Sequence, residues 1–332
     1  MLKTTVKNLW LYFKKSLHML WKGISHAAVS WPKAFATVVA LLFLSYYPLG
    51  GYLSENIDKT ADYNWTRESE QQSLTVETMA FLINREVNEN LWTANLPMFF
   101  PSYFLDNMPN YQKGIISSLA VVSSVIAKQT QCPDEVKEKT AITEAAKLLK
   151  YPANVWLFAP DNKLKIAPSS AAQYRKARKM LKDYNRLLPN GECLWSRDEI
   201  DLSGLVAAVR RDLTRATEQL ETQVSEHGSD FTDGQADDLF YFCQGKMYAY
   251  MLVLKSAGTD FKQVLIDGHQ YENWTKIISA LENGVALSPS VVRNAELDDA
   301  FAANHLIALG YYMMRAVNLL GEIEDLNKGV SL

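Results

Sequence analysis

The stretch AFATVVALLFLSYYPLGGYLS, residues 34–54, carries no charged side chain between Lys33 and Glu55. A helix of about 20 apolar residues is long enough to cross the roughly 30 Å hydrocarbon core of a bilayer. Trp31 precedes the stretch and three tyrosines lie in its second half, as aromatic side chains do at the two membrane interfaces. The sequence therefore predicts a transmembrane helix over residues 34–54.

The charges on the two sides of this segment differ in sign. Residues 1–33 contain six lysines and no acidic residue, whereas the rest of the 332-residue chain carries 28 basic and 37 acidic side chains. Because basic residues beside a transmembrane helix stay in the cytoplasm, we expect a single-pass membrane protein with a cytoplasmic N-terminus and an exported body, which is periplasmic if the host is Gram-negative. A cleaved signal peptide would have a shorter basic region and a small-residue cleavage pattern. The acidic body argues against nucleic acid as a partner.

Residues 2–24 form a second element related to the membrane. Leucines and other apolar residues recur there at helical spacing, and five lysines fall on the opposite side of the helical wheel. This pattern is typical of an amphipathic helix lying in an anionic leaflet. A helix that packs on another protein has the same pattern, so this alternative stays open.

The remainder of the chain predicts an all-α, bundle-like periplasmic domain over residues 71–332, joined to the crossing by a polar linker over residues 55–70. Its apolar residues recur mostly at helical spacing. One small β-hairpin is predicted near residues 154–166, where NVWLF and KLKIA flank the turn-forming Pro160-Asp161-Asn162. In residues 202–220, apolar side chains follow a 4-3-4-3-4 spacing, typical of a long helix in an antiparallel hairpin or of a dimeric coiled coil.

The three cysteines all lie in the predicted exported body. Cys132 and Cys193 lie in connecting segments, whereas Cys243 lies on a predicted core helix. In an oxidising compartment two cysteines can pair and leave one over, so we predict a Cys132–Cys193 disulfide and a buried thiol at Cys243. No histidine pair has metal-ligand spacing, and no motif for a nucleophile or a nucleotide occurs. Neither a metal nor a cofactor is therefore predicted.

One stretch, REVNENLWTANLPMFFPSYFLDNMPNYQ (residues 85–112), concentrates acidic, amide and aromatic side chains. Paired carboxylates beside aromatic rings suit glycan binding or cleavage of a cell-wall polymer. The candidate catalytic residues are Glu86, Glu89 and Asp106. The candidate binding residues are Arg85, Trp92, Asn95, Asn107 and Asn110. The alternative is a structural corner in which asparagines cap backbone groups, aromatic rings fill the core and Arg85 pairs with Glu89 one turn on.

Four stretches resemble a family of uncharacterised bacterial envelope proteins that is catalogued as a domain of unknown function, DUF2333. They are REVNENLWTANLPMFFPSYFLDNMPNYQKGI, KLLKYPANVWLF, AAQYRKARKMLKDYNRLL and NHLIALGYYMMRA. The resemblance covers most of the chain from the crossing onward, and WTANLP…LDNMPN is its most specific part. It implies a proteobacterial inner-membrane protein with one N-terminal crossing and a helical periplasmic body. It carries over no catalytic or binding residue.

These observations predict a membrane-anchored scaffold or interaction protein of an envelope assembly. The missing catalytic motifs and the long helical faces favour this function over an enzyme. Its expected partners are the lipid bilayer, through residues 34–54 and the basic helix 2–24, and another envelope protein. The alternative is a periplasmic glycan-binding protein or cell-wall-active hydrolase that uses residues 85–112.

Overall fold

The computed structural model describes most of the chain, namely residues 15, 18–19, 21–22, 32–63, 66–132, 140–158, 166–191, 193–227, 234–294 and 304–329. The described part is helical apart from turns, connecting segments and two isolated antiparallel bridges, which confirms the all-α class. The predicted amphipathic helix over residues 2–24 lies mostly outside the described residues. The chain divides into two compact units: residues 1–54 with 98–104, named here the anchor unit, and residues 55–97 with 105–332, named the body.

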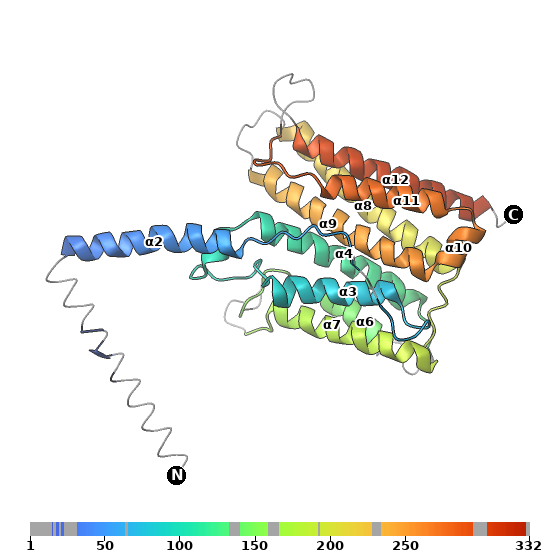
Figure 1. The fold of residues 1–332 in the computed structure, drawn as a ribbon, viewed down its shortest axis with the longest axis horizontal. Coiled ribbons are helices and arrows are strands. Elements are labelled where there is room, and N and C mark those ends of the chain that lie inside the picture. Colours follow the sequence, from blue (N-terminus) through green and yellow to red (C-terminus); the bar gives the residue numbers. More distant parts are fainter. Residues whose placement is uncertain are drawn as a thin grey trace, which may run out of the picture. The chain divides into compact units, whose positions relative to one another are not determined.

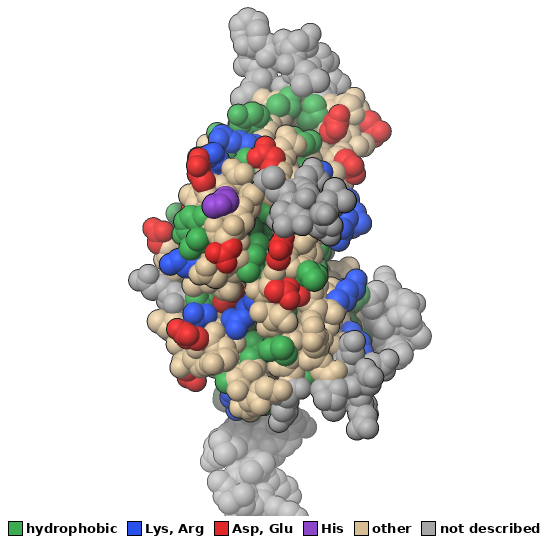
Figure 2. All heavy atoms as spheres, turned by 90° about the vertical axis from the view of Figure 1, so that its right-hand side faces the viewer, with side chains coloured by type: hydrophobic (Ala, Val, Ile, Leu, Met, Phe, Trp, Pro, Cys, Tyr) green, Lys and Arg blue, Asp and Glu red, His purple; other side chains and the backbone are tan. Residues whose placement is uncertain are grey.

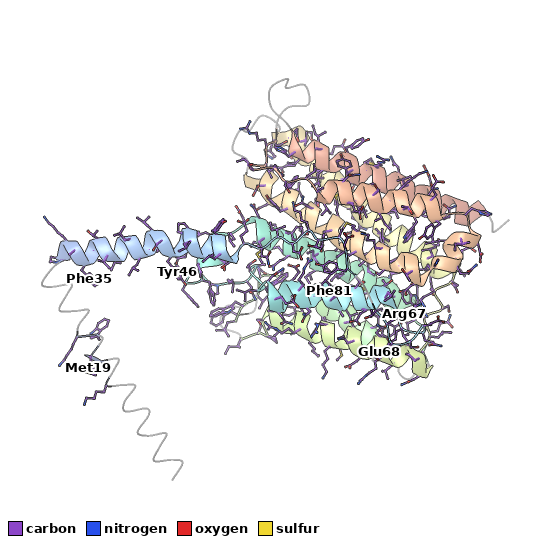
Figure 3. All side chains as sticks on the ribbon, in the orientation of Figure 1. Met19, Phe35, Tyr46, Arg67, Glu68 and Phe81 are labelled. Carbon is purple, nitrogen blue, oxygen red and sulfur yellow. A yellow bond between two sulfur atoms is a disulfide. The ribbon has the colours of Figure 1, made fainter. Side chains whose placement is uncertain are left out.

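The anchor unit contains helix α2 (Pro32–Ser54), which covers the predicted crossing. Among the described residues it alone is long and apolar enough to span a membrane. Its side chains, including Phe35 and Tyr46, project outward along its length (Figure 3). A surface helix of a soluble protein would bury one apolar stripe, whereas almost all of α2 is exposed.

The body consists of two groups of helices (Figure 1). The first group contains α3 (Leu74–Asn84), α4 (Asn107–Gln129), α6 (Ala141–Leu149) and α7 (Ser170–Leu187). The second contains α8 (Glu199–His227), α9 (Gly234–Asp260), the short α10 (Lys262–Asp267), α11 (Tyr271–Val285) and α12 (His305–Gly329). The two groups meet chiefly where α4 packs against α9, and α8 also contacts α4.

The heptad spacing of residues 202–220 is explained by packing within the chain. All six of its apolar positions on α8 are buried in the core: Leu202, Val206, Val209, Leu213, Ala216 and Leu220. They face α12, α4 and α9 rather than a second copy of the chain. The antiparallel packing of α8 against another helix of the body therefore accounts for the heptad spacing of its apolar residues.

Two glycines set the closest approach of the two groups of helices. A Cβ atom at Gly114 of α4 would lie 2.1 Å from the backbone oxygen of Phe242, and one at Gly245 of α9 would lie 2.1 Å from that of Tyr111. Any larger residue at either position would overlap the opposite backbone. The α4–α9 contact therefore depends on the missing side chains on both sides.

A disulfide joins Cys132 to Cys193, the pair expected from the sequence, across 61 residues of chain. Next to it, Gln131 and Leu194 exchange two backbone hydrogen bonds of 2.8 Å each. The third thiol, Cys243, is free and fully buried on α9, and burial raises its pKa to about 12.

The hairpin predicted near residues 154–166 is reduced to a single bridge between Phe158 and Ile166. Its turn, residues 159–165, lies outside the described residues. An isolated two-stranded hairpin is marginally stable, and here the backbone N–H of Val155 donates to the Ser170 hydroxyl (2.9 Å) while its carbonyl accepts from the Ser170 N–H (2.8 Å). Among the described residues, the segment is thus held by the start of α7 and, beside the bridge, by the N–H of Ala167, which donates to the carbonyl of Leu157 (3.0 Å).

Candidate functional site

The stretch 85–112 begins where α3 changes into a short π-helix, Arg85–Glu89. The wider turn is closed by the N–H of Asn90, which donates to the carbonyl of Arg85 at 2.8 Å. Such π-turns occur frequently at functional sites. Here the altered spacing pairs Arg85 with its neighbour Glu86, and not with Glu89 as in the structural corner considered from the sequence.

Arg85 lies at the centre of a buried polar network. Its side chain and that of Glu86 are almost inaccessible, with residue exposures of 3% and 1%. The Arg85 Nε atom donates to Glu86 Oε1 at 2.7 Å, and Nη1 donates to Asp58 Oδ2 at 3.2 Å. Nη1 also donates to the hydroxyl of Tyr248, whose ring centroid lies 4.7 Å from the guanidinium carbon. The guanidinium therefore joins the π-helix, α9 and the segment that follows α2 in sequence.

That segment is bound to the body by further hydrogen bonds. The Tyr248 hydroxyl donates to the carbonyl of Thr60 (2.7 Å), and the Tyr111 hydroxyl donates to that of Asp58 (3.0 Å). Lys59 Nζ donates to the carbonyl of Leu287 at 2.7 Å. Partial burial of the Lys59 ammonium group lowers its pKa to about 8. The described part of the predicted linker, residues 55–63 and 66–70, is thus an ordered segment along the body and is named here the strap.

The electrostatics of the network follow from its burial. Burial raises the pKa of Glu86, and the Arg85 guanidinium opposes that rise. Burial alone would lower the pKa of Arg85, but Glu86 and the two tyrosines hold it above its usual value. Burial also works against the charge of Asp58, yet hydrogen bonds from Thr60 and the charge of Arg85 leave its pKa lowered. Each charge is therefore stabilised by an internal partner, which is how proteins tolerate buried ions.

Two of the candidate binding residues hold the loop before α7. Trp92 is buried, its Nε1 donates to the carbonyl of Ala153 (2.9 Å), and its ring packs edge-on against Tyr174. Asn95 Nδ2 donates to the carbonyl of Val155 at 2.7 Å. Both side chains therefore use their polar atoms on backbone groups.

The remaining candidates lie at the surface of the body. Glu89 is exposed and accepts from Asn84 Nδ2 at 2.5 Å. Asp106 caps α4, because its Oδ1 accepts from the backbone N–H of Asn107 at 3.0 Å. Asn110 Nδ2 donates to the carbonyl of Asp106 (3.0 Å) and to Asp238 Oδ1 (2.6 Å). The three candidate carboxylates thus have three different environments, and the four main cavities of the body contain none of them in their walls.

Acidic side chains gather near the start of α9. Partial burial, together with the charges of Asp106, Asp238 and Glu55, raises the pKa of Asp237 to about 6. In the described part of the chain, no group of three or more His, Cys, Asp or Glu residues is arranged to hold a metal ion.

The raised pKa of Asp237 predicts a pH-dependent stability. A carboxyl group whose pKa is higher in the folded state stabilises the fold when protonated, below about pH 4, and that contribution is lost as the pH rises through about 6. We therefore expect Asp237→Asn to raise the free energy of unfolding at pH 7 by about 1 kcal/mol, after allowance for solvent screening. The difference from the wild type should vanish at pH 4. Urea unfolding at both pH values measures it, and a gain that is independent of pH would contradict the assignment.

Sequence reasoning missed the partners that make the Arg85 network. Asp58 and Tyr248 lie 27 and 163 residues from Arg85 in the chain. Asp58 lies in the predicted polar linker and Tyr248 in the predicted helical body, so neither carried a local signal of the contact. A tyrosine within a strongly apolar helix does indicate a buried hydroxyl that needs a partner, but it does not say which partner.

The anchor unit contains the rest of the stretch, Met98–Phe104. The hydroxyl of Tyr47 donates to the carbonyl of Met98 (2.7 Å), and that of Tyr46 donates to the carbonyl of Phe99 (2.9 Å). Pro101 lies directly against Gly50, where a Cβ atom would overlap the proline ring. Four apolar or aromatic side chains of this loop are nevertheless exposed: Met98, Phe99, Tyr103 and Phe104.

The comparisons with known proteins concern the second group of helices. Residues 198–329 match the family described as "Uncharacterized protein conserved in bacteria (DUF2333)". This segment resembles DUF2333. The resemblance expected from the sequence is confirmed there, including NHLIALGYYMMRA, whereas residues 85–112 lie outside the match. The comparisons with curated proteins and with solved structures found no match.

The matched segment, which comprises α8 to α12, contains an apolar groove of about 840 Å³ between α8 and α12. Leu220 and Val224 of α8 face Ile307, Met314 and Leu319 of α12 across it. The chain also leaves space at Gly310, where a Cβ atom would meet only Leu220 Cδ1, at 3.9 Å. At the end of the body shown in Figure 2, by contrast, acidic and basic side chains are interspersed with apolar ones.

Proposed function

We propose that the protein is a non-catalytic interaction protein of the bacterial envelope, held in the inner membrane by α2 with its body in the periplasm. The six lysines before residue 34 support a cytoplasmic N-terminus by the positive-inside rule. The Cys132–Cys193 disulfide suits an oxidising compartment such as the periplasm. The basic segment 2–24 would add binding to an anionic lipid surface.

The anchor unit is built in a way that suits a lipid interface. Backbone carbonyls in a lipid environment must find partners within the protein, since water is scarce there. Tyr46 and Tyr47 supply such partners to the loop Met98–Phe104, and the loop exposes aromatic and apolar side chains. Exposed aromatic rings next to an apolar helix are typical of membrane-interface belts.

The single observation that carries the interaction role is the apolar groove between α8 and α12. Its length and apolar walls suit the apolar face of one amphipathic helix, a common mode of recognition between proteins. Two acidic side chains, Glu221 and Glu322, and one basic side chain, Arg315, line the groove, so its charged rim is net negative, and neither glutamate forms an ion pair with another described residue. We therefore propose that the occupant is an amphipathic helix of an envelope protein whose polar edge carries Lys or Arg.

The hydrolase and glycan-binding alternative has less support. A glycosidase needs two carboxyl groups that flank one substrate bond. Glu86 is buried in an ion pair, Glu89 is exposed on the π-helix, and Asp106 caps α4. A Glu89→Gln variant that is fully folded yet inactive in a deletion strain would favour the enzyme.

A crosslinking experiment in intact cells tests the interaction role. A photoreactive residue in place of Tyr311, which is exposed on the groove wall, should form one discrete protein adduct. Gly310→Trp should abolish this adduct, because Gly310 lines the groove, its Cβ position meets only Leu220 Cδ1 within 4 Å, and a large ring added there would occupy the space of the ligand helix. Gly234→Trp is the matched control, since Gly234 also has open space around it but lies outside the groove. An adduct that persists in Gly310→Trp would contradict the proposed occupant.

A further inference from the structure

A second groove, between α4 and α8, combines an apolar floor with cationic walls. Its volume is about 710 Å³, within the range of small-molecule sites. Val121 and Val125 of α4, Leu149 at the end of α6, and Phe242 of α9 contribute apolar surface to it. Five basic side chains surround this floor: Lys113, Lys128, Lys150, Arg211 and Arg215.

Among the described residues that line this groove, basic side chains outnumber acidic ones. Asp212 is the one acidic residue that lines it. Its Oδ2 already accepts hydrogen bonds from Lys246 Nζ and from the Tyr250 hydroxyl, both at 2.6 Å. Among the described residues, Lys128, Lys150 and the two arginines form no ion pair. This is notable in a chain whose acidic residues outnumber its basic ones, 37 to 34.

Two of the cations also repel each other. Arg211 and Arg215 lie one turn apart on the same face of α8, and like charges at this spacing destabilise a helix. An anion bound between them would remove that repulsion. Guanidinium groups bind carboxylates and phosphates through paired N–H donors, so two adjacent arginines provide a site for one such group.

The apolar floor extends away from the arginines. The stretch of α4 from Lys113 to Lys128 is about 22 Å long at 1.5 Å per residue. Lysines can lay their methylene chains on apolar surface while their ammonium groups reach solvent, so Lys128 and Lys150 are compatible with an apolar chain between them.

We propose that this groove binds an anionic amphiphile, with a carboxylate or phosphate head at Arg211 and Arg215 and an apolar chain along α4. The site is separate from the apolar groove between α8 and α12, because the two use different faces of α8. The amphiphile can come from the bilayer or from solution, and the two sources share this chemistry.

Photolabelling of the full chain tests the proposal. The protein is placed in nanodiscs of zwitterionic lipid and exposed to decanoic acid that carries a diazirine at its chain end, and the labelled peptides are identified by mass spectrometry. We expect label in α4 near Val121 and Val125, displaced by decyl phosphate but neither by decyl maltoside nor by inorganic phosphate. Nanodiscs that contain an anionic phospholipid report on the source: displacement of the label there indicates the bilayer, and retention indicates a soluble amphiphile.

Two double variants test whether labelling depends on the arginines of this groove or on positive charge anywhere on the surface. Arg211→Gln with Arg215→Gln should weaken labelling of α4 by about tenfold in apparent affinity. Lys179→Gln with Lys262→Gln removes two exposed cations outside the groove and should leave the labelling unchanged. Displacement of the label by decyl maltoside would mean that only the apolar floor binds the probe. Displacement by inorganic phosphate would mean that only the positive charge binds it. Equal labelling of the two double variants would mean that the arginines take no part in binding. Each of these three results would overturn the proposal.

Discussion

Replacing Arg85 by methionine is expected to lower the free energy of unfolding of the body by about 3–5 kcal/mol. The substitution keeps an unbranched aliphatic stem but removes the guanidinium, so it leaves Glu86 buried without its partner and removes the bond to Asp58. An uncompensated buried carboxylate is costly, and burial already raises the pKa of Glu86. Urea titration of the full chain in detergent micelles, followed by tryptophan fluorescence, measures the loss.

Two variants make this prediction specific. Adding Glu86→Leu to Arg85→Met removes the orphaned charge and should recover about half of the lost stability, because apolar replacement of a buried pair is often tolerated. Arg186→Met is the matched control, since Arg186 is 74% exposed in its ion pair with Asp183 and should change stability by less than about 0.5 kcal/mol. A loss below about 1 kcal/mol in Arg85→Met would show that the network does not hold the strap.

Replacing Gly245 by alanine is expected to destabilise the body by about 3 kcal/mol, the upper end of the usual range for overpacking. The added methyl group would lie 2.1 Å from the backbone oxygen of Tyr111, so the two helices must separate. A flexible side chain could turn aside, but a helix backbone cannot. Gly114→Ala should have a similar effect because its Cβ meets the Phe242 oxygen at the same distance. The double variant should cost less than the sum, since one separation relieves both overlaps.

Replacing Gly310 of α12 by alanine is expected to stabilise the body, in contrast to the alanine substitutions at Gly114 and Gly245. Its Cβ has ordinary contact distance to Leu220, and alanine favours a helix interior by about 1 kcal/mol over glycine. Thermal unfolding should therefore place Gly310→Ala above the wild type and both α4–α9 variants below it. Similar melting temperatures for all three alanine variants would contradict the packing described for α4 and α9.

The candidate site was only partly predictable. The composition of residues 85–112 marked an unusual stretch, yet the structure distributes it over a π-helix that is buried at Arg85 and Glu86 and exposed at Glu89, the start of α4 and the anchor unit. The pairing of Arg85 depended on a π-turn, which moves neighbouring side chains out of α-helical register. Asp58 and Tyr248 are distant in sequence, so no local pattern joins them to Arg85. Neither the groove between α4 and α8 nor the apolar groove between α8 and α12 was predicted from the sequence, because each combines residues of different helices.

Properties that depend on local periodicity and composition could be inferred from the sequence alone. The uncharged run of residues 34–54 gives a helix long enough to cross a membrane, and 3.6-residue spacing gives an all-α body. Only the tertiary structure decided which faces meet. In the tertiary structure the heptad residues of α8 are buried within the chain, and α4 packs closely against α9 at two glycines. The segment after α2 is bound to Arg85 through an ion pair with Asp58. Such contacts depend on shape and on charge pairs between distant segments, and the period of any single helix does not contain that information.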